Sequence, residues 1–184
     1  MSKTLTLILG GARSGKSAFA QRLAQAAPSV LFVATAEAGD ADMAARILAH
    51  QQARPASWKT LEEPLELEKA IPLSGGGATL IVLDCLTLWV SNILLKDQAL
   101  TVNEVEARAR GLLIRYREGE PSWVVVSNEV GLGIVPETYL GRRYRDLLGR
   151  VNQCFAEAAD QVYLMVAGLA LDLTRASPGP ATER

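Results

Sequence analysis

Short, continuous apolar runs alternate along the chain with longer segments whose apolar residues recur at helical spacing. The runs predict buried strands at 4–9, 30–34, 79–83, 122–127 and 161–166, with a weaker strand at 58–61. The longer segments predict helices at 17–27, 40–53, 65–70, 86–95, 102–118 and 136–159, with Pro136 near the start of the last, where proline fits best. Continuously apolar strands that alternate with helices are typical of a parallel sheet covered on both faces. We therefore predict an α/β fold with a mainly parallel sheet and helices on both of its faces.

The chain has 184 residues, a usual length for one domain, and neither an internal repeat nor a long linker divides it. The glycines at 75–77 predict a loop rather than a domain boundary. We expect a single domain over 1–176 and a flexible tail at 177–184, where proline, glycine and serine are frequent.

Composition and charge exclude several classes of protein. Lysine and arginine number 19 and the acidic residues 20, so a net charge of −1 offers no bulk attraction to nucleic acid or to an anionic membrane. The two cysteines, Cys85 and Cys154, lie far apart, which favours a reducing cytoplasm over a disulfide framework. One histidine leaves no zinc-ligand spacing, and the apolar run near Leu5 is too short for a membrane span. We expect a cytoplasmic protein that has no integral membrane segment and binds no nucleic acid.

A glycine-rich segment between the first strand and the first helix carries the strongest chemical signal. It matches the phosphate-loop pattern G-x-x-x-x-G-K-[ST] with Gly10, Gly11, Ala12, Arg13, Ser14, Gly15, Lys16 and Ser17. In such a loop the backbone N–H groups face a bound phosphate, and the start of the helix adds partial positive charge. We expect Lys16 on the β- and γ-phosphates and the Ser17 hydroxyl on Mg²⁺. The alternative interpretation is a plain glycine-rich turn.

Asp84 ends the apolar strand at 79–83. A carboxylate at the C-terminal tip of a central strand beside a phosphate loop can hold the second side of a Mg²⁺ ion. It can also cap the helix that follows from Leu86, and the two roles are compatible. We expect Ser17 and Asp84 to be the metal ligands.

Two further groups of polar residues have two interpretations each. Glu129 follows the fourth strand, where ligands of such sheets bind, so it could orient a hydroxyl nucleophile or a metal-bound water. It could equally be a solvated residue in a glycine-rich connection. The last helix carries a crowd of arginines that could bind substrate phosphate or form a solvated or subunit-contact face: Arg142, Arg143, Arg145 and Arg150.

His50 is the only imidazole in the chain and the candidate nucleophile. A neutral imidazole attacks phosphorus, and cations beside a histidine favour that neutral form while attracting phosphate. Arg46 and Arg54, each four residues away, would supply such cations. A single histidine can also have a purely structural role.

With these residues in view, the sequence resembles a known family, the bifunctional adenosylcobinamide kinase/adenosylcobinamide-phosphate guanylyltransferases of cobalamin biosynthesis. The matching stretches are the phosphate loop, 43–47 running into His50 and 54–55, 127–131 with 133–136, and 149–153. They are spread from residue 10 to residue 153, so the resemblance spans nearly the whole chain. Apart from the generic phosphate loop, the stretches are specific in this order and spacing. The resemblance implies a RecA-like P-loop NTPase fold, a homotrimer, GTP or ATP as substrate, and Mg²⁺.

The resemblance also implies two reactions. A nucleoside triphosphate phosphorylates the aminopropanol hydroxyl of the corrinoid adenosylcobinamide; GTP then transfers GMP to that phosphate through a GMP-histidine intermediate, giving adenosylcobinamide-GDP and pyrophosphate. His50 stands at the guanylylated position, with Lys16 as the second catalytic residue. Nucleotide contacts would fall on the phosphate loop and on Ala34, Thr35, Ala36, Gln51, Gln52, Ala53, Arg54, Glu62 and Asp84. Two departures are visible, because some members carry Glu in place of Asp84 and a second His in place of Ala49.

Two other functions compete with this one. A simple P-loop small-molecule kinase would leave His50 structural. A nucleotide-driven switch or motor subunit of the recombination type would need a nucleic-acid surface, and the net charge of −1 and the lack of a basic, aromatic-laced loop argue against it.

Overall fold

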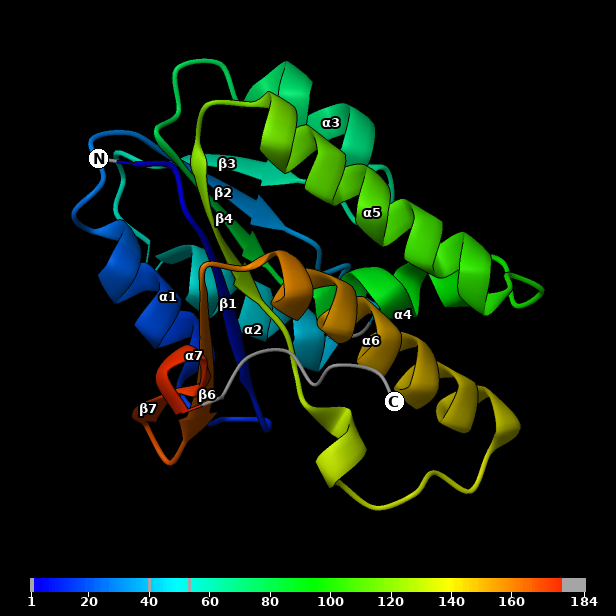
Figure 1. Cartoon of the computed structure of the whole chain (residues 1–184). Helices are drawn as coiled ribbons and strands as arrows, with labels where there is room; N and C mark the ends of the chain where they lie inside the picture. The colour runs from blue at the N-terminus through cyan, green and yellow to red at the C-terminus, as the bar shows by residue number, and fades with distance from the viewer. Residues whose placement is uncertain (1, 40, 53, 177–184) are drawn as a thin grey trace.

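The computed structural model describes residues 2–39, 41–52 and 54–176, with the backbone but not the side chains of 42, 43, 46, 49 and 50. Its strands form one seven-stranded sheet in the order β3-β2-β4-β5-β1-β6-β7 (Figure 1). They are β1 (Leu5–Gly10), β2 (Val30–Ala34), β3 (Lys59–Glu62), β4 (Leu80–Asp84), β5 (Ser122–Val126), β6 (Gln161–Val166) and β7 (Leu169–Asp172). Neighbouring strands are parallel except β6 and β7, so the predicted mainly parallel α/β fold is confirmed.

Every helix and strand expected from the apolar pattern is present. The helices are α1 (Lys16–Ala24), α2 (Ala41–Gln52), α3 (Leu67–Ser74), α4 (Leu86–Lys96), α5 (Val102–Glu118), η1 (Val130–Leu132), α6 (Tyr139–Ala158) and α7 (Leu173–Ala176). The pattern did not predict β7, the 3-10 helix η1 or α7, because each is only three or four residues long and none has a buried face. The tail predicted at 177–184 lies outside the described residues.

The last long helix begins later than predicted. Thr138 is its N-cap, and the Thr138 side chain accepts a hydrogen bond of 3.1 Å from the Gly141 N–H. Pro136 therefore lies before the helix rather than in its first turn. A Cβ on Gly141 would lie 2.7 Å from Pro136 Cβ, so the glycine lets the proline pack back against the helix start.

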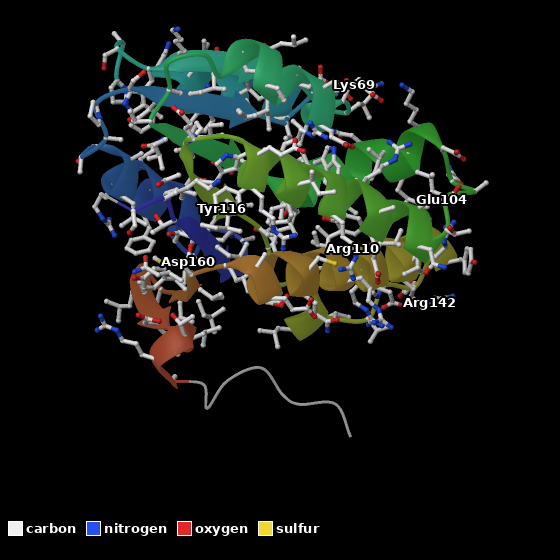
Figure 2. All side chains as sticks on the ribbon, turned by 45° about the horizontal axis from the view of Figure 1, so that its top comes forward. Lys69, Glu104, Arg110, Tyr116, Arg142 and Asp160 are labelled. Carbon is white, nitrogen blue, oxygen red and sulfur yellow. The ribbon has the colours of Figure 1, made fainter. Side chains whose placement is uncertain are left out.

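Helices cover the two faces of the sheet unequally. The larger core, which includes Trp123 and Phe155, lies under α3, α4, α5 and α6, and Figure 2 shows α5 and α6 side by side on this face. The smaller core lies under α1, which contributes Ala20. Side chains alternate along β1, with Leu7 in the larger core and Ile8 in the smaller one. Burial of both faces explains why these strands are apolar at successive positions.

Both ends of α5 are capped by side chains. Thr101 and Glu104 form a capping box at its start. At its end, the Lys3 ammonium donates hydrogen bonds of 2.7, 2.9 and 2.8 Å to the carbonyls of Tyr116, Arg117 and Gly119. A cation in this position satisfies carbonyls that have no partner within the helix and complements the helix dipole.

The carboxyl ends of the five central parallel strands meet at one edge of the sheet, where ligands of such folds bind. β5 lies between β1 and β4, so one strand separates the phosphate loop from Asp84. Among the described residues, no helix has both the length and the apolar character that crossing a membrane requires.

Candidate active site

The phosphate loop joins β1 to α1 through backbone conformations that favour glycine. Gly15, the N-cap of α1, has φ 97°, and Gly10 has φ 150°. A Cβ on Gly10 would lie only 2.6 Å from Met165 O, so the loop packs directly on β6. Arg13 also adopts a left-handed φ of 57°. Left-handed turns of this kind bring successive N–H groups to one side, which is what phosphate binding needs.

Two polar side chains of the loop are buried. Lys16 is 8% exposed, and its ammonium donates a 2.6 Å hydrogen bond to Gly11 O. Burial lowers the pKa of Lys16 below its ordinary value, whereas the negative charge of Asp84 opposes that shift. The Ser14 hydroxyl is also buried and has no hydrogen-bond partner in the described part of the chain. An anion bound in the loop would give both groups an acceptor.

The turn between β6 and β7 supports the loop from outside. The Gly168 N–H donates a 3.0 Å hydrogen bond to Ser14 O, and a Cβ on Gly15 would lie 3.3 Å from Gly168 Cα. Only glycines allow so close an approach. The sequence offered no sign of this contact, because Gly168 lies far from the loop along the chain.

Three of the predicted nucleotide-binding residues lie side by side at the strand ends. Ala34 ends β2 and is in register with Glu62 at the end of β3 and with Asp84 at the end of β4. The N-cap of α4 is Cys85, so Asp84 lies one residue before the cap position. The role of Asp84 as a metal ligand stays a prediction.

Thr35 fixes the backbone beside Asp84. Its fully buried hydroxyl donates to Cys85 O at 2.7 Å and accepts from Cys85 N–H at 2.8 Å. Its N–H donates to Asp84 O, and its carbonyl accepts from the side chain of Asn92. All the polar groups of Thr35 therefore have partners within the chain. Its predicted contact with nucleotide is untested, and the half-buried Ala36 follows it directly.

Gln51, in the last turn of α2, and Arg54, just after that helix, lie near the same strand ends. The Arg54 guanidinium lies 3.8 Å from the ring centroid of Phe32, and its Nε and Nη1 are buried without a hydrogen-bond partner. Burial lowers the pKa of Arg54, and the charges of Asp84 and Glu62 counteract this. The Gln51 side chain donates a 2.5 Å hydrogen bond to Glu62. Gln51, Glu62 and Arg54 thus form a polar cluster, and the charge of Asp84 acts on both Arg54 and Lys16.

Helix α2, which carries His50, contrasts with its surroundings. None of its described side chains is buried, and Leu48 is 54% exposed. Gln52, at its last turn, is exposed as well. The side chain of His50 and the whole of Ala53 lie outside the described residues, so their predicted roles are untested.

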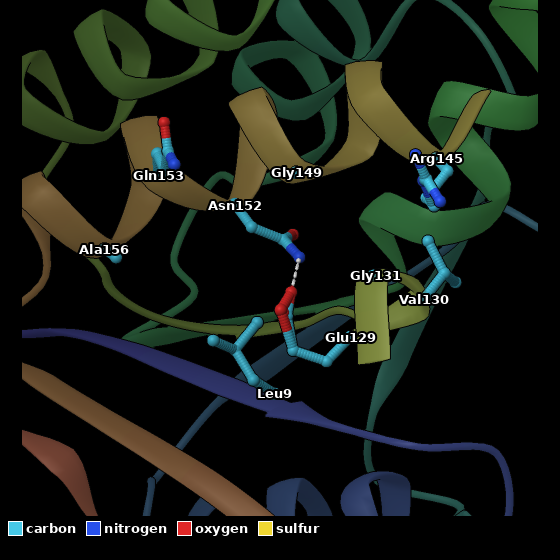
Figure 3. Close-up of a pocket in the computed structure, with 9 residues that line it drawn as sticks. All are labelled: Leu9, Glu129, Val130, Gly131, Arg145, Gly149, Asn152, Gln153 and Ala156. Carbon is cyan, nitrogen blue, oxygen red and sulfur yellow. Dashed lines mark hydrogen bonds between the residues drawn. The ribbon is translucent and has the colours of Figure 1, made fainter. Parts of the chain in front are cut away.

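A hydrogen-bond network links the segment after β5 to α6 (Figure 3). Buried Asn152 accepts a 2.6 Å hydrogen bond from the Ser127 hydroxyl and donates to Asn128 O at 3.0 Å and to Glu129 Oε1 at 3.1 Å. Glu129 and Asn152 line a cavity of about 260 Å³ between α6 and η1. The structure thus rejects a merely solvated Glu129. The role of Asn152 was not predicted, because a polar residue within a charged helix normally faces solvent.

The arginines of α6 do not act as one group. Arg142 donates to backbone carbonyls of the loop before α6, and Arg143 to carbonyls between α4 and α5. Arg150 is exposed, and Arg145 lines the cavity beside Glu129. These arginines therefore do not form one phosphate-binding group. Arg142 and Arg143 have structural contacts, and Arg145 is the one of the four that lines the cavity.

Comparisons with known proteins bear on the family and on the fold of the chain. The family model described as "Cobinamide kinase / cobinamide phosphate guanyltransferase" matches residues 6–173. The chain is 44% identical to the bifunctional adenosylcobalamin biosynthesis protein CobP of Pseudomonas aeruginosa, over 91% of this chain and 95% of that protein. It is 39% identical to the corresponding CobU of Salmonella typhimurium, over 92% and 99% of the two chains. In fold it resembles the ATP synthase subunit NeqB of Nanoarcheaum equitans, with a TM-score of 0.50 and 10% identity over 97% of this chain and 53% of that one. That likeness supports the expected RecA-like P-loop NTPase fold.

Proposed function

The chain belongs to the cobinamide kinase / cobinamide phosphate guanyltransferase family, and from this premise we propose that one nucleotide site at the phosphate loop serves both reactions. The first reaction phosphorylates the hydroxyl of cobinamide with GTP or ATP. The second transfers GMP from GTP to cobinamide phosphate and releases pyrophosphate.

The observation that carries this proposal is the gathering of unsatisfied donors at one edge of the sheet. The buried Ser14 hydroxyl and two buried Arg54 nitrogens have no described partner, and the negative charge of Asp84 acts on both Lys16 and Arg54. Buried donors without acceptors are costly, and phosphate oxygens of a bound nucleotide would satisfy them. Glu62 and Gln51 would border the same nucleotide.

Ser17 and Asp84 are the residues that would hold Mg²⁺ with the nucleotide. No group of three or more histidine, cysteine or acidic side chains in the described part of the chain could hold a metal ion alone. This fits Mg²⁺, which commonly takes one or two protein ligands and completes its shell with phosphates and water. Bound there, it would neutralise phosphate charge.

His50 is the nucleophile of the proposed guanylyl transfer. An imidazole nitrogen attacks the α-phosphorus of GTP, the bond to the pyrophosphate oxygen breaks, and pyrophosphate leaves. A phosphate oxygen of cobinamide phosphate then attacks the same phosphorus and releases the imidazole. Arg54, four residues further along, supplies positive charge at the strand ends near this helix.

We also propose a cytoplasmic homotrimer. Apolar residues are exposed in and after η1, with Leu132 at 80%, Ile134 at 95% and Val135 at 58%. An apolar surface of this kind favours contact with another copy of the chain. Sedimentation equilibrium should give three times the chain mass, and a single-chain mass at micromolar concentration would contradict the trimer.

Intact-mass measurement after incubation with Mg²⁺ and GTP tests the mechanism. We expect one added GMP group when pyrophosphate is removed, located on His50 by peptide mapping. The adduct should be labile in acid and stable in base, as a phosphoramidate is. A simple kinase with a structural His50 predicts no adduct at all.

A further inference from the structure

The cavity between α6 and η1 lies beside the phosphate loop. Leu9, the last residue but one of β1, forms part of its wall. The Glu129 N–H donates a 3.1 Å hydrogen bond to Gly10 O, the first residue of the phosphate loop. Because β1 and β5 are parallel neighbours, the cavity opens at the same edge of the sheet as the nucleotide site.

Asn152 fixes the carboxylate of Glu129 in this cavity. The amide oxygen of Asn152 accepts from Ser127, and its nitrogen donates to Asn128 O and Glu129 Oε1. A flipped amide would set its oxygen against a carbonyl and a carboxylate, so one orientation is specified. Figure 3 shows the two side chains pointing toward one another across the cavity. None of the ion pairs between described residues includes Glu129.

Glycines in the cavity wall leave room that the chain itself does not use. A Cβ on Gly149, within α6, or on Gly131, within η1, would meet no atom within 4 Å. Gly141 of the same helix differs, because a Cβ there would collide with Pro136 and Thr138. A glycine within a helix costs roughly 0.5–1 kcal/mol relative to alanine. Packing among the described residues therefore does not explain why position 149 is a glycine. A ligand that approaches α6 closely at this point would explain it.

We propose that this cavity binds the hydroxyl-bearing arm of the cobinamide acceptor and that Glu129 takes the hydroxyl proton during phosphorylation. In this step the hydroxyl oxygen forms a bond to the γ-phosphorus, the bond from that phosphorus to the leaving nucleoside diphosphate breaks, and the proton passes to the Glu129 carboxylate. Asn152 is a positioning residue that acts through Glu129. The inference rests on the proposed function, since it needs an alcohol acceptor at this edge.

Arg145 gives the cavity the charge that the product requires. Its Nε and Nη2 donate 3.3 Å hydrogen bonds to the adjacent Asp146, whose side chain is largely exposed, so solvent screens this ion pair. The acceptor arm enters as a neutral alcohol and becomes a phosphate monoester, which guanidinium groups bind well. The same cavity can thus hold the acceptor of both reactions.

Glu129→Gln separates the two reactions. The amide keeps the size and the hydrogen bond from Asn152 but cannot take a proton, so kinase kcat should fall roughly 10²- to 10⁴-fold. Guanylyl transfer to supplied cobinamide phosphate should fall far less than the kinase rate, because that acceptor is already ionised. A merely structural role for Glu129 would lower both rates together. Equal losses, or kinase activity close to the wild-type level, would overturn the proposal.

Gly149→Phe tests the cavity independently of Glu129. The ring would fill the space where the glycine leaves room, so KM for cobinamide should rise by about tenfold or more while KM for GTP stays unchanged. Glu157→Phe is the matched control, because Glu157 is exposed on α6 outside the cavity. An unchanged cobinamide KM in Gly149→Phe, with a thermal unfolding curve like that of wild type, would place the acceptor elsewhere.

The wild-type enzyme distinguishes the two levels of inference. Suppose that wild type phosphorylates cobinamide but the Glu129 and Gly149 variants do not change kcat or KM as expected. Then the cavity assignment is wrong and the proposed function stands. If wild type forms no cobinamide phosphate with Mg²⁺ and GTP, the proposed function itself fails.

Discussion

Helices α1 and α2 both carry proposed catalytic residues, yet the chain holds them in very different ways. α1 starts in the phosphate loop, buries Lys16, Ala20 and Ala24, and is braced at its start by the Gly168 turn. The described side chains of α2 are all exposed or half-buried, and neither core includes them. Phosphoryl transfer at the loop needs hydrogen-bond donors that are held in fixed positions. In the proposed guanylyl transfer, His50 attacks the α-phosphorus instead of aligning a hydroxyl with the γ-phosphorus, and a helix whose described side chains lie outside both cores would move more easily than α1.

Of the substitutions considered, His50→Ala should separate the roles of α1 and α2 most clearly. Guanylyl transfer should fall by several orders of magnitude, because no other imidazole can form the covalent intermediate. Kinase activity should persist, since it depends on the phosphate loop, Mg²⁺ and an aligned hydroxyl. Separate assays with cobinamide and with cobinamide phosphate measure the two rates, and Leu48→Ala on the same helix is the control. Parallel loss of both activities would show that α2 serves the kinase as well.

Lys16→Ala should affect both reactions, in contrast to His50→Ala. Removal of the ammonium from the phosphate site costs roughly 3–4 kcal/mol of transition-state stabilisation, or about 10²- to 10³-fold in kcat. Lys69→Ala is the matched control, because the Lys69 side chain is 80% exposed on α3. Near-normal guanylyl transfer in Lys16→Ala would mean that a second nucleotide site exists.

Asp84→Asn should have a smaller effect, one that depends on the metal concentration. Loss of a charged oxygen ligand costs about 1.5–3 kcal/mol, which corresponds to roughly 10- to 100-fold in Mg²⁺ affinity. Titration of activity with Mg²⁺ measures the shift, and excess Mg²⁺ should restore part of the rate. If the variant instead lost thermal stability at unchanged Mg²⁺ dependence, Asp84 would be structural.

Matched alanine-to-glycine substitutions should show the smallest effects and sharpen the contrast in packing. Ala20→Gly in α1 should lower the free energy of unfolding by about 1–2 kcal/mol, through lost helix propensity and one buried methyl group. Ala44→Gly in α2 should lower it by less than about 0.5 kcal/mol, because an exposed helix that opens locally contributes little to global unfolding. Urea denaturation gives both values. If the two variants lost the same free energy of unfolding, α2 would unfold together with the core.

Local sequence signals predicted the frame of the site but not the contacts that tie it together. The phosphate loop, Asp84 and the central strands were found because each depends on neighbouring residues: a motif, a strand tip or a continuous apolar run. The bracing by Gly168 and the orientation of Glu129 by Asn152 join segments that are distant in sequence. The start of α6 was misplaced because Pro136 favours a first helical turn, whereas the Thr138 cap sets the observed start.

The central position of β1 has a consequence for the order in which the protein can be assembled. Its partners are β5 and β6, with Leu5 in register with Trp123 and Leu7 with Val162. The strand that is synthesised first therefore cannot pair with both neighbours until more than four-fifths of the chain has followed it, and such distant pairings are slow to form. A nascent chain that stops before β6 contains the whole phosphate-binding motif, but it lacks Met165 and Gly168, against which the loop is shaped. The contacts that shape the loop can therefore form only near the end of synthesis.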